Sequence, residues 1–321
     1  VPGGSTYTGS TLLSFAANLF GPVMVAKALR TPFLVAVFNC FLLVLMVRLA
    51  GGIPGVRRRY FLLLYMLNAQ SLVSIVTLNK EIFASLGLVA FFAWNASRRR
   101  YWLFALAAVF SIMARWEQLA VILLYLFLEN RFSPFRKRHK TALLFVIGFL
   151  TILYPLALRF SGIDISGILA IADSSGLISR MDSIQANFGL PLVIVPKIMM
   201  NLFNRMLVPT YFLGSEFLSL NFTDLQSNVI IHLQTLAMLV LFVAALFKRR
   251  LDLSRPIPYF IALYLILTAI SPFIQTRYEY PVYVLLCIQL ARDPLVLRSL
   301  SSTTASRSAS RLHFRLPFLK A

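Results

Sequence analysis

Long apolar stretches alternate with short polar connections along most of the chain. An α-helix needs about 20 apolar residues to cross the hydrocarbon core of a bilayer, and shorter runs can cross it by tilting or by local thinning. The pattern therefore predicts an all-α, polytopic integral membrane protein with about nine transmembrane helices. The predicted spans are 31–50, 60–78, 81–96, 101–116, 117–130, 141–159, 229–247, 256–274 and 277–291.

Two stretches depart from this pattern. Residues 11–29 are apolar but contain Gly21-Pro22 and Lys27, which favours an amphipathic or half-inserted helix. Residues 160–228 are less apolar and are divided by prolines, so we expect a large extracytoplasmic loop with amphipathic helices. The prolines of this loop are Pro191, Pro196 and Pro209, and its acids are Asp164, Asp173, Asp182, Glu216 and Asp224.

The domain organisation follows from these stretches. Residues 1–298 are interpreted as a single transmembrane domain that includes the large loop at 160–228, and residues 299–321 as a basic cytoplasmic tail. The chain opens in a Gly/Ser/Thr-rich stretch without an initiator Met, so we expect further sequence upstream of Val1.

Composition and charge support a membrane protein. The chain of 321 residues is 59% hydrophobic and only 13% charged, whereas soluble domains are about 45–50% apolar and about 25% charged. The net charge of +20 does not indicate nucleic-acid binding, because the basic residues lie between apolar runs and not on one soluble face.

The basic residues follow a sided arrangement. Of the 31 Lys and Arg residues, 22 lie in alternate connections and the tail, together with only three of the 11 acids. The positive-inside rule therefore predicts that these connections and the C-terminus are cytoplasmic. The basic segments are 48–59, 98–100, 129–140, 248–255 and the chain after residue 291.

This alternation predicts turns on the far side of the membrane at 79–81, 114–117 and 275–279. Residues 101–130 contain no Gly or Pro, so one long helix is the alternative to a hairpin there. We favour the hairpin, because a single helix would place two basic clusters on opposite sides.

The predicted far-side turns each carry a base and an acid. Ionisable groups at membrane depth are costly and are candidates for function. The alternative is that these charges only end helices at the membrane interface, paired with one another or with lipid headgroups. The three sets are Lys80 with Glu81, Arg115 with Glu117, and Arg277 with Glu279.

These residue types suit phosphate chemistry. Guanidinium groups bind phosphate oxygens in bidentate geometry and Lys adds a point charge, while a carboxylate can act as a general base on an acceptor hydroxyl. Nearby aromatic residues are expected in the interfacial belt, with stacking on a sugar ring as the alternative. We predict Glu81, Glu117 and Glu279 as catalytic, Lys80, Arg115, Arg277, Tyr278 and Trp116 as substrate-binding, and Tyr280 and Tyr283 as further belt residues.

No motif for nucleotide, dinucleotide or zinc chemistry occurs in the sequence. Its two cysteines lie in apolar runs and its three histidines are far apart, so we predict no metal site formed by these side chains. No cofactor is assigned, and a divalent cation is left open.

The N-terminal part of the chain resembles a known family. Residues 6–50 contain TYTGSTLLSF, then NLFGP, then Arg30, and then an apolar span that ends in Arg48. This order resembles the early part of GT-C glycosyltransferases.

Two shorter motifs extend the resemblance over roughly residues 6–130 and 256–291. Lys80-Glu81 at the start of a span resembles a pattern in membrane polysaccharide polymerases of the Wzy and EpsG type. Arg277-Tyr278-x-x-Pro281 resembles an element near the end of both groups.

The resemblance implies a GT-C-like fold in the bacterial inner membrane, with sugar transferred from a polyprenyl-(di)phosphate-linked donor to a glycan acceptor on the extracytoplasmic face. One feature departs from it: GT-C enzymes usually carry an acidic motif in the first extracytoplasmic loop, and no acid lies between Val1 and Lys80. The motif lies upstream, or the base is elsewhere, or the chain is not such an enzyme. The polymerases rely more on arginines, which suits Arg115 and Arg277.

Two other classes of function remain as alternatives. A transporter or flippase for an anionic lipid or solute would use the same cations as its binding site. A non-catalytic membrane subunit would use the charged turns to contact a partner chain.

Overall fold

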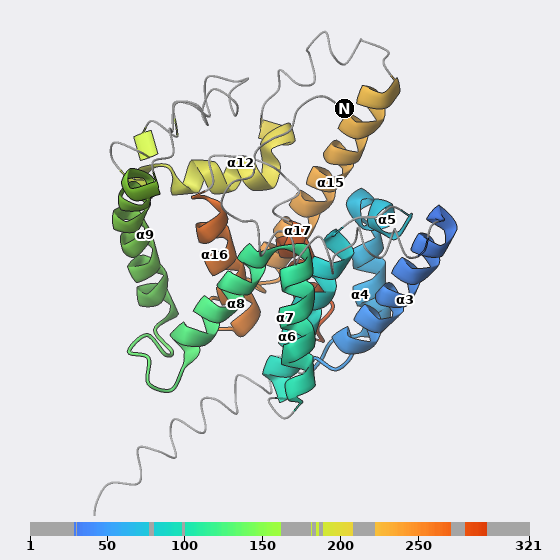
Figure 1. The fold of residues 1–321 in the computed structure, drawn as a ribbon, viewed down its shortest axis with the longest axis horizontal. Coiled ribbons are helices and arrows are strands. Elements are labelled where there is room, and N and C mark those ends of the chain that lie inside the picture. The colour runs from blue at the N-terminus through green and yellow to red at the C-terminus, as the bar shows by residue number, and fades with distance from the viewer. Residues whose placement is uncertain are drawn as a thin grey trace, which may run out of the picture.

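Eleven α-helices and one short 3-10 helix form the described part of the chain, and no sheet occurs in it. The structure is a computed structural model (Figure 1). It describes residues 29, 31–76, 80–97, 100–161, 181, 184–185, 189–207, 222–270 and 280–293.

The helices confirm most of the predicted apolar segments as helical. Eight of the nine predicted spans each correspond to one helix, while the predicted helix at 11–29 and the tail at 299–321 lie outside the described residues. The helices are α3 (Pro32–Ala50), α4 (Arg58–Met66), α5 (Ala69–Val76), α6 (Glu81–Ser97), α7 (Tyr101–Ala114), α8 (Trp116–Glu129), α9 (His139–Ser161), α12 (Ile194–Leu207), α15 (Phe222–Phe247), α16 (Pro256–Thr268) and α17 (Tyr280–Leu290), with η1 (Leu190–Leu192) before α12.

The predicted single span at 60–78 is wrong, because the chain breaks into α4 and α5 at Leu67 and Asn68. The Asn68 side chain accepts a hydrogen bond from the backbone N–H of Gln70, with 2.8 Å between Oδ1 and N. Asparagine is favoured at such a helix N-terminus because it satisfies a backbone donor that the helix leaves unpaired.

The described residues of the expected loop at 160–228 include the short η1 and α12, and α12 is kinked at Phe203. α9 continues to Ser161, and α15 already begins at Phe222. Pro196 lies in the first turn of α12, where a proline interrupts no hydrogen bond within the helix. Pro209 lies outside the described residues.

Four polar connections meet at one end of the helices, which we call the basic end. They are the α3–α4, α8–α9 and α15–α16 connections and the residues after α17 (Figure 1). The hydrogen bonds that join them are Arg57 N to Ala291 O at 3.0 Å, Asp293 N to Gly55 O at 2.7 Å, Gln289 Nε2 to Arg250 O at 2.7 Å, and His139 Nδ1 with Leu253 O at 2.7 Å.

The opposite end, which we call the polar end, holds the starts of α6 and α8, and α12 lies crosswise over it (Figure 1). The α7–α8 connection confirms the predicted hairpin. α7 ends at Ala114, Arg115 is extended with φ −157° and ψ 108°, and α8 begins at Trp116. The chain therefore returns towards the basic end after Arg115, as the alternation of basic segments required.

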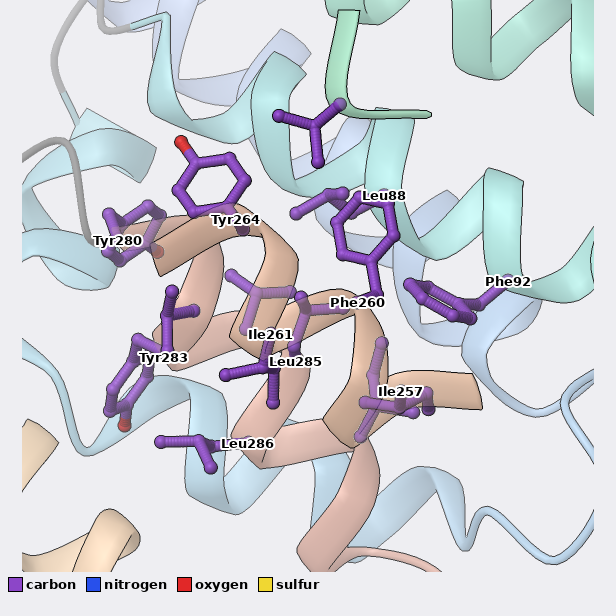
Figure 2. Close-up of a cluster of buried hydrophobic side chains, with 14 of the residues drawn as sticks. Leu88, Phe92, Ile257, Phe260, Ile261, Tyr264, Tyr280, Tyr283, Leu285 and Leu286 are labelled. Atoms are coloured by element: carbon purple, nitrogen blue, oxygen red, sulfur yellow. The ribbon is translucent and has the colours of Figure 1, made fainter. Parts of the chain in front are cut away.

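Three helices form the interior. The first 13 residues of α6 are buried, as are most of α16 and the first ten residues of α17. Figure 2 shows Leu88 and Phe92 of α6 with Phe260 of α16 and with Leu285 of α17 in this core. The rings of Phe92 and Phe260 meet edge to face, with 5.3 Å between their centroids.

The outer helices bury one face and expose large apolar side chains on the other. Among the described helices, only α3, over Phe33–Ala50, is both long and apolar enough to cross a membrane, while seven other segments are apolar but shorter. The exposed side chains include Phe33 and Phe41 on α3, Trp102 on α7, Phe127 on α8, Phe149 on α9 and Phe247 on α15.

Candidate functional site

A buried ion pair joins two turns at the polar end. Arg115, between α7 and α8, donates from Nη2 to Oε1 of Glu81, the first residue of α6, at 2.5 Å. The two side chains are only 4% and 3% exposed. A charge-assisted hydrogen bond of this length in a site shielded from water is stronger than one at a surface.

The pairing differs from the one that sequence neighbours suggested. Arg115 contacts Glu81 of another turn, and Glu117 of its own turn is exposed. Glu117 is the second residue of α8, whereas Arg115 is the extended residue before that helix. The structure thus brings together two of the eight predicted site residues, Glu81 and Arg115.

Buried polar groups continue from this pair between α6, α7 and α8. The Nε2 of Gln118 donates to the backbone oxygen of Ala84 at 3.0 Å and to Oγ of Ser111 at 2.9 Å. Gly87 makes room for this contact, because a Cβ there would lie 3.0 Å from Ser111 Oγ and 3.1 Å from Gln118 Nε2. A side chain at this position would press against Ser111 and Gln118, so glycine favours the close approach of the three helices.

The remaining predicted site residues are described only in part. Lys80 is exposed and directly precedes α6. Trp116 is the first residue of α8, and the structure does not describe its side chain. Arg277, Tyr278 and Glu279 lie outside the described residues. Their predicted roles stay predictions.

Sequence reasoning missed a buried cation, Lys197 on α12. Its side chain is 1% exposed, and Nζ donates to Oε1 of Gln185 at 2.5 Å. Gln185 Nε2 in turn donates to the backbone oxygen of Ile270 at 3.4 Å. Ile270 is the last described residue before the segment that contains Arg277. The sequence feature that could have indicated a buried cation is the single lysine in the otherwise apolar sequence IVPKIMM.

The prediction that Tyr280 and Tyr283 belong to an interfacial belt is wrong. Both are fully buried in α17, and Tyr280 Oη lies 2.7 Å from Oγ of Ser71 on α5. Tyr283 donates to the backbone oxygen of Leu64. Buried tyrosines find such partners because an unpaired hydroxyl is costly away from water. These residues therefore join α17 to α4 and α5.

No group of three His, Cys, Asp or Glu side chains that could hold a metal ion occurs within the described ranges. The divalent cation that the sequence left open stays a prediction. Comparison with models of known families, with curated proteins and with solved structures finds no match to this chain.

Proposed function

We propose that the chain is an integral membrane glycosyltransferase or polysaccharide polymerase with a GT-C-like arrangement. It transfers a sugar from a polyprenyl-(di)phosphate-linked donor to a glycan acceptor at the polar end, which faces the extracytoplasmic side of a bacterial inner membrane. The basic end then faces the cytoplasm, in agreement with the positive-inside rule.

The outward apolar faces support the membrane location. Side chains such as Phe41, Phe127 and Phe247 are 63–83% exposed on three different helices. Soluble monomers rarely expose extended apolar surfaces of this kind, whereas lipid tails solvate them. The short helices would cross with the help of their flanking turns and a locally thinned bilayer.

The buried Arg115–Glu81 pair is the observation that carries the proposed chemistry. Buried charges away from water are costly, so their retention at one end favours a function there. The pair fixes the position of a guanidinium. A guanidinium held in place can bind a phosphate through two parallel hydrogen bonds. Lys197 adds a second buried cation at the same end.

In the proposed reaction, the acceptor hydroxyl attacks the anomeric carbon of the donor sugar. The bond from this carbon to the phosphate oxygen breaks, and the hydroxyl proton passes to a carboxylate. Arg115 and Lys197 stabilise the negative charge that develops on the leaving phosphate. We assign Glu81 to positioning Arg115, and exposed Glu117 to the base, with Glu279 as the other candidate.

Arg115→Lys tests this proposal, because it retains the positive charge but removes the planar fork of donors. We expect about 10²-fold less glycan product in cells that carry only this variant, with normal amounts of folded protein. Arg277→Lys should act similarly. Arg131→Lys, which changes an exposed arginine at the basic end, is the matched control and should leave the product unchanged. Wild-type amounts of glycan from a double variant that combines Arg115→Lys with Arg277→Lys would exclude the proposed role.

A further inference from the structure

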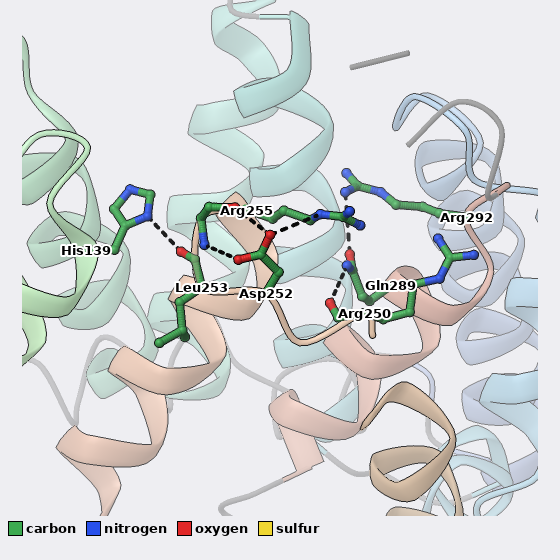
Figure 3. A network of polar contacts seen from close by, with 8 residues as sticks. His139, Arg250, Asp252, Leu253, Arg255, Gln289 and Arg292 are labelled. Carbon is green, nitrogen blue, oxygen red and sulfur yellow. Dashed lines mark hydrogen bonds and ion pairs between the residues drawn. The ribbon is translucent and has the colours of Figure 1, made fainter. Parts of the chain in front are cut away.

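A second group of cations lies at the basic end, where two arginines of the α15–α16 connection meet one that follows α17. Arg250 follows α15, Arg255 precedes α16, and Arg292 follows α17. Figure 3 shows Arg255 and Arg292 extending towards Gln289, with Arg250 beside the same residue. Charge sidedness alone requires basic residues at this end, but it does not require that one of them, Arg250, be buried.

Local backbone structure turns Arg250 inward. The N–H of Arg250 donates to Ala245 O at 2.8 Å, and the N–H of Arg249 donates to Leu246 O at 2.9 Å. This pair of bonds is the Schellman motif that ends a helix, with Arg249 in the left-handed conformation at φ 50°. Glycine is usual there. The motif reverses the chain, so that Arg250 packs against the end of α17.

Gln289 links the backbone of Arg250 to the side chain of Arg292. It is fully buried, donates from Nε2 to Arg250 O at 2.7 Å, and accepts from Arg292 Nη1 at 3.4 Å. Gln289 is neutral, so these contacts do not balance the charge of either arginine. The guanidinium of Arg292 is thus contacted by a side chain that leaves its charge uncompensated, beside the buried Arg250.

The nearby carboxylates balance only part of this charge, although Asp293 attracts the guanidinium of Arg250. Asp293 accepts from Arg57 Nη2 at 2.5 Å. Asp252 accepts from the backbone N–H and the hydroxyl of Ser254 at 3.0 and 2.7 Å, and its Oδ2 lies 4.0 Å from Nε of Arg255. The group of three arginines therefore carries more positive charge than its acidic neighbours balance.

Two donors of this group lack a hydrogen-bond partner among the described residues. They are Nη1 of Arg250, a residue that is only 8% exposed, and Nε of Arg292. Burial, reinforced by the charges of Arg255 and Arg250, lowers the pKa of Arg292 to about 10. A buried charged donor without an acceptor is costly, and an anionic oxygen would remove that cost.

We propose that Arg250, Arg255 and Arg292 form a binding site for a phosphate-type oxyanion at the basic end. The phosphate of an anionic lipid headgroup and a soluble phosphate share the chemistry that this site recognises. Bound oxygens accept from Nη1 of Arg250 and Nε of Arg292, while Arg255 closes the more exposed side. The site is separate from the proposed transfer site at the polar end and does not depend on it.

Thermal unfolding of the purified full chain in a neutral detergent tests this site. Phosphatidylglycerol at a concentration about 100-fold above its Kd should raise the Tm of the wild type by about 5 °C. Inorganic phosphate, compared with chloride at equal ionic strength, forms the second arm. A shift with the lipid alone identifies a headgroup, and a shift with both identifies any phosphate oxyanion.

Arg250→Gln and Arg292→Gln should each abolish the rise in Tm that the anion causes. Without an anion, the Tm of each variant should be no lower than that of the wild type, because the repulsion between the arginines is relieved. Arg255→Gln changes a less buried residue and is the second variant if either of these fails to fold. Arg131→Gln removes one exposed charge at the same end and should retain the full shift. Absence of a shift with both anions, or an equal shift in Arg255→Gln and the wild type, would overturn the site.

Discussion

Arg115→Ala is expected to lower the free energy of unfolding by about 3–5 kcal/mol, because it leaves the carboxylate of Glu81 buried without its counter-charge. The two side chains are 4% and 3% exposed, so water cannot replace the guanidinium in the folded protein. A large part of the loss is the cost of a charge held away from water, and not the strength of the hydrogen bond itself.

A double-mutant cycle separates these contributions. The double variant Glu81→Gln with Arg115→Gln removes both charges and keeps side chains of similar size. Its loss in the free energy of unfolding should be smaller than the summed losses of Glu81→Gln and Arg115→Gln as single variants. The measurement is the fraction of monodisperse protein that remains after heating, over a range of temperatures. Arg131→Ala, an exposed arginine, should change stability by no more than about 0.5 kcal/mol. If Arg115→Ala behaved like this control, the buried pair would not exist as described.

Lys197→Met is expected to abolish glycan product while leaving the protein as stable as the wild type, or more so. Lys197 is 1% exposed, and replacing a buried cation with an apolar side chain of similar length removes a desolvation cost. The lost interaction between Nζ and Gln185 Oε1 offsets part of this gain. Stability and activity should therefore change in opposite directions, as they do where a site is retained for function.

The matched control is Lys248→Met, which changes an exposed lysine at the basic end and should affect neither quantity. Product from cells and the Tm of purified protein are measured on the same preparations. If Lys197→Met were destabilised and fully active, the lysine would be part of the structure alone and would have no part in sugar transfer.

The helices were largely predictable from the sequence, because apolar runs and charged connections are local features. The turn at Arg115 is the clearest case: no Gly or Pro marks it, yet the alternation of basic segments required a reversal there. The break at Asn68 was missed, because its immediate neighbours Leu67 and Ala69 are apolar and the capping hydrogen bond cannot be read from the sequence.

The contacts of the site were less predictable, because they join residues far apart in the sequence. Glu81 and Arg115 were both selected, but each was paired with its neighbour in its own turn, and the structure pairs them across 34 positions. Lys197 was overlooked because burial depends on how α12 packs, which its local sequence does not specify. Arg277 lies outside the described residues, so its place relative to this pair stays a prediction.

The orientation of the two ends across a membrane can be measured directly by thiol labelling. Cys40 and Cys287 are first replaced with Ala, and single cysteines are then introduced at two exposed positions, as Lys80→Cys at the polar end and Arg131→Cys at the basic end. A membrane-impermeant thiol reagent is added to intact spheroplasts and to lysed ones. We expect Lys80→Cys to be labelled in both and Arg131→Cys only after lysis. Labelling of both positions, or of Arg131→Cys alone, in intact spheroplasts would contradict the proposed orientation.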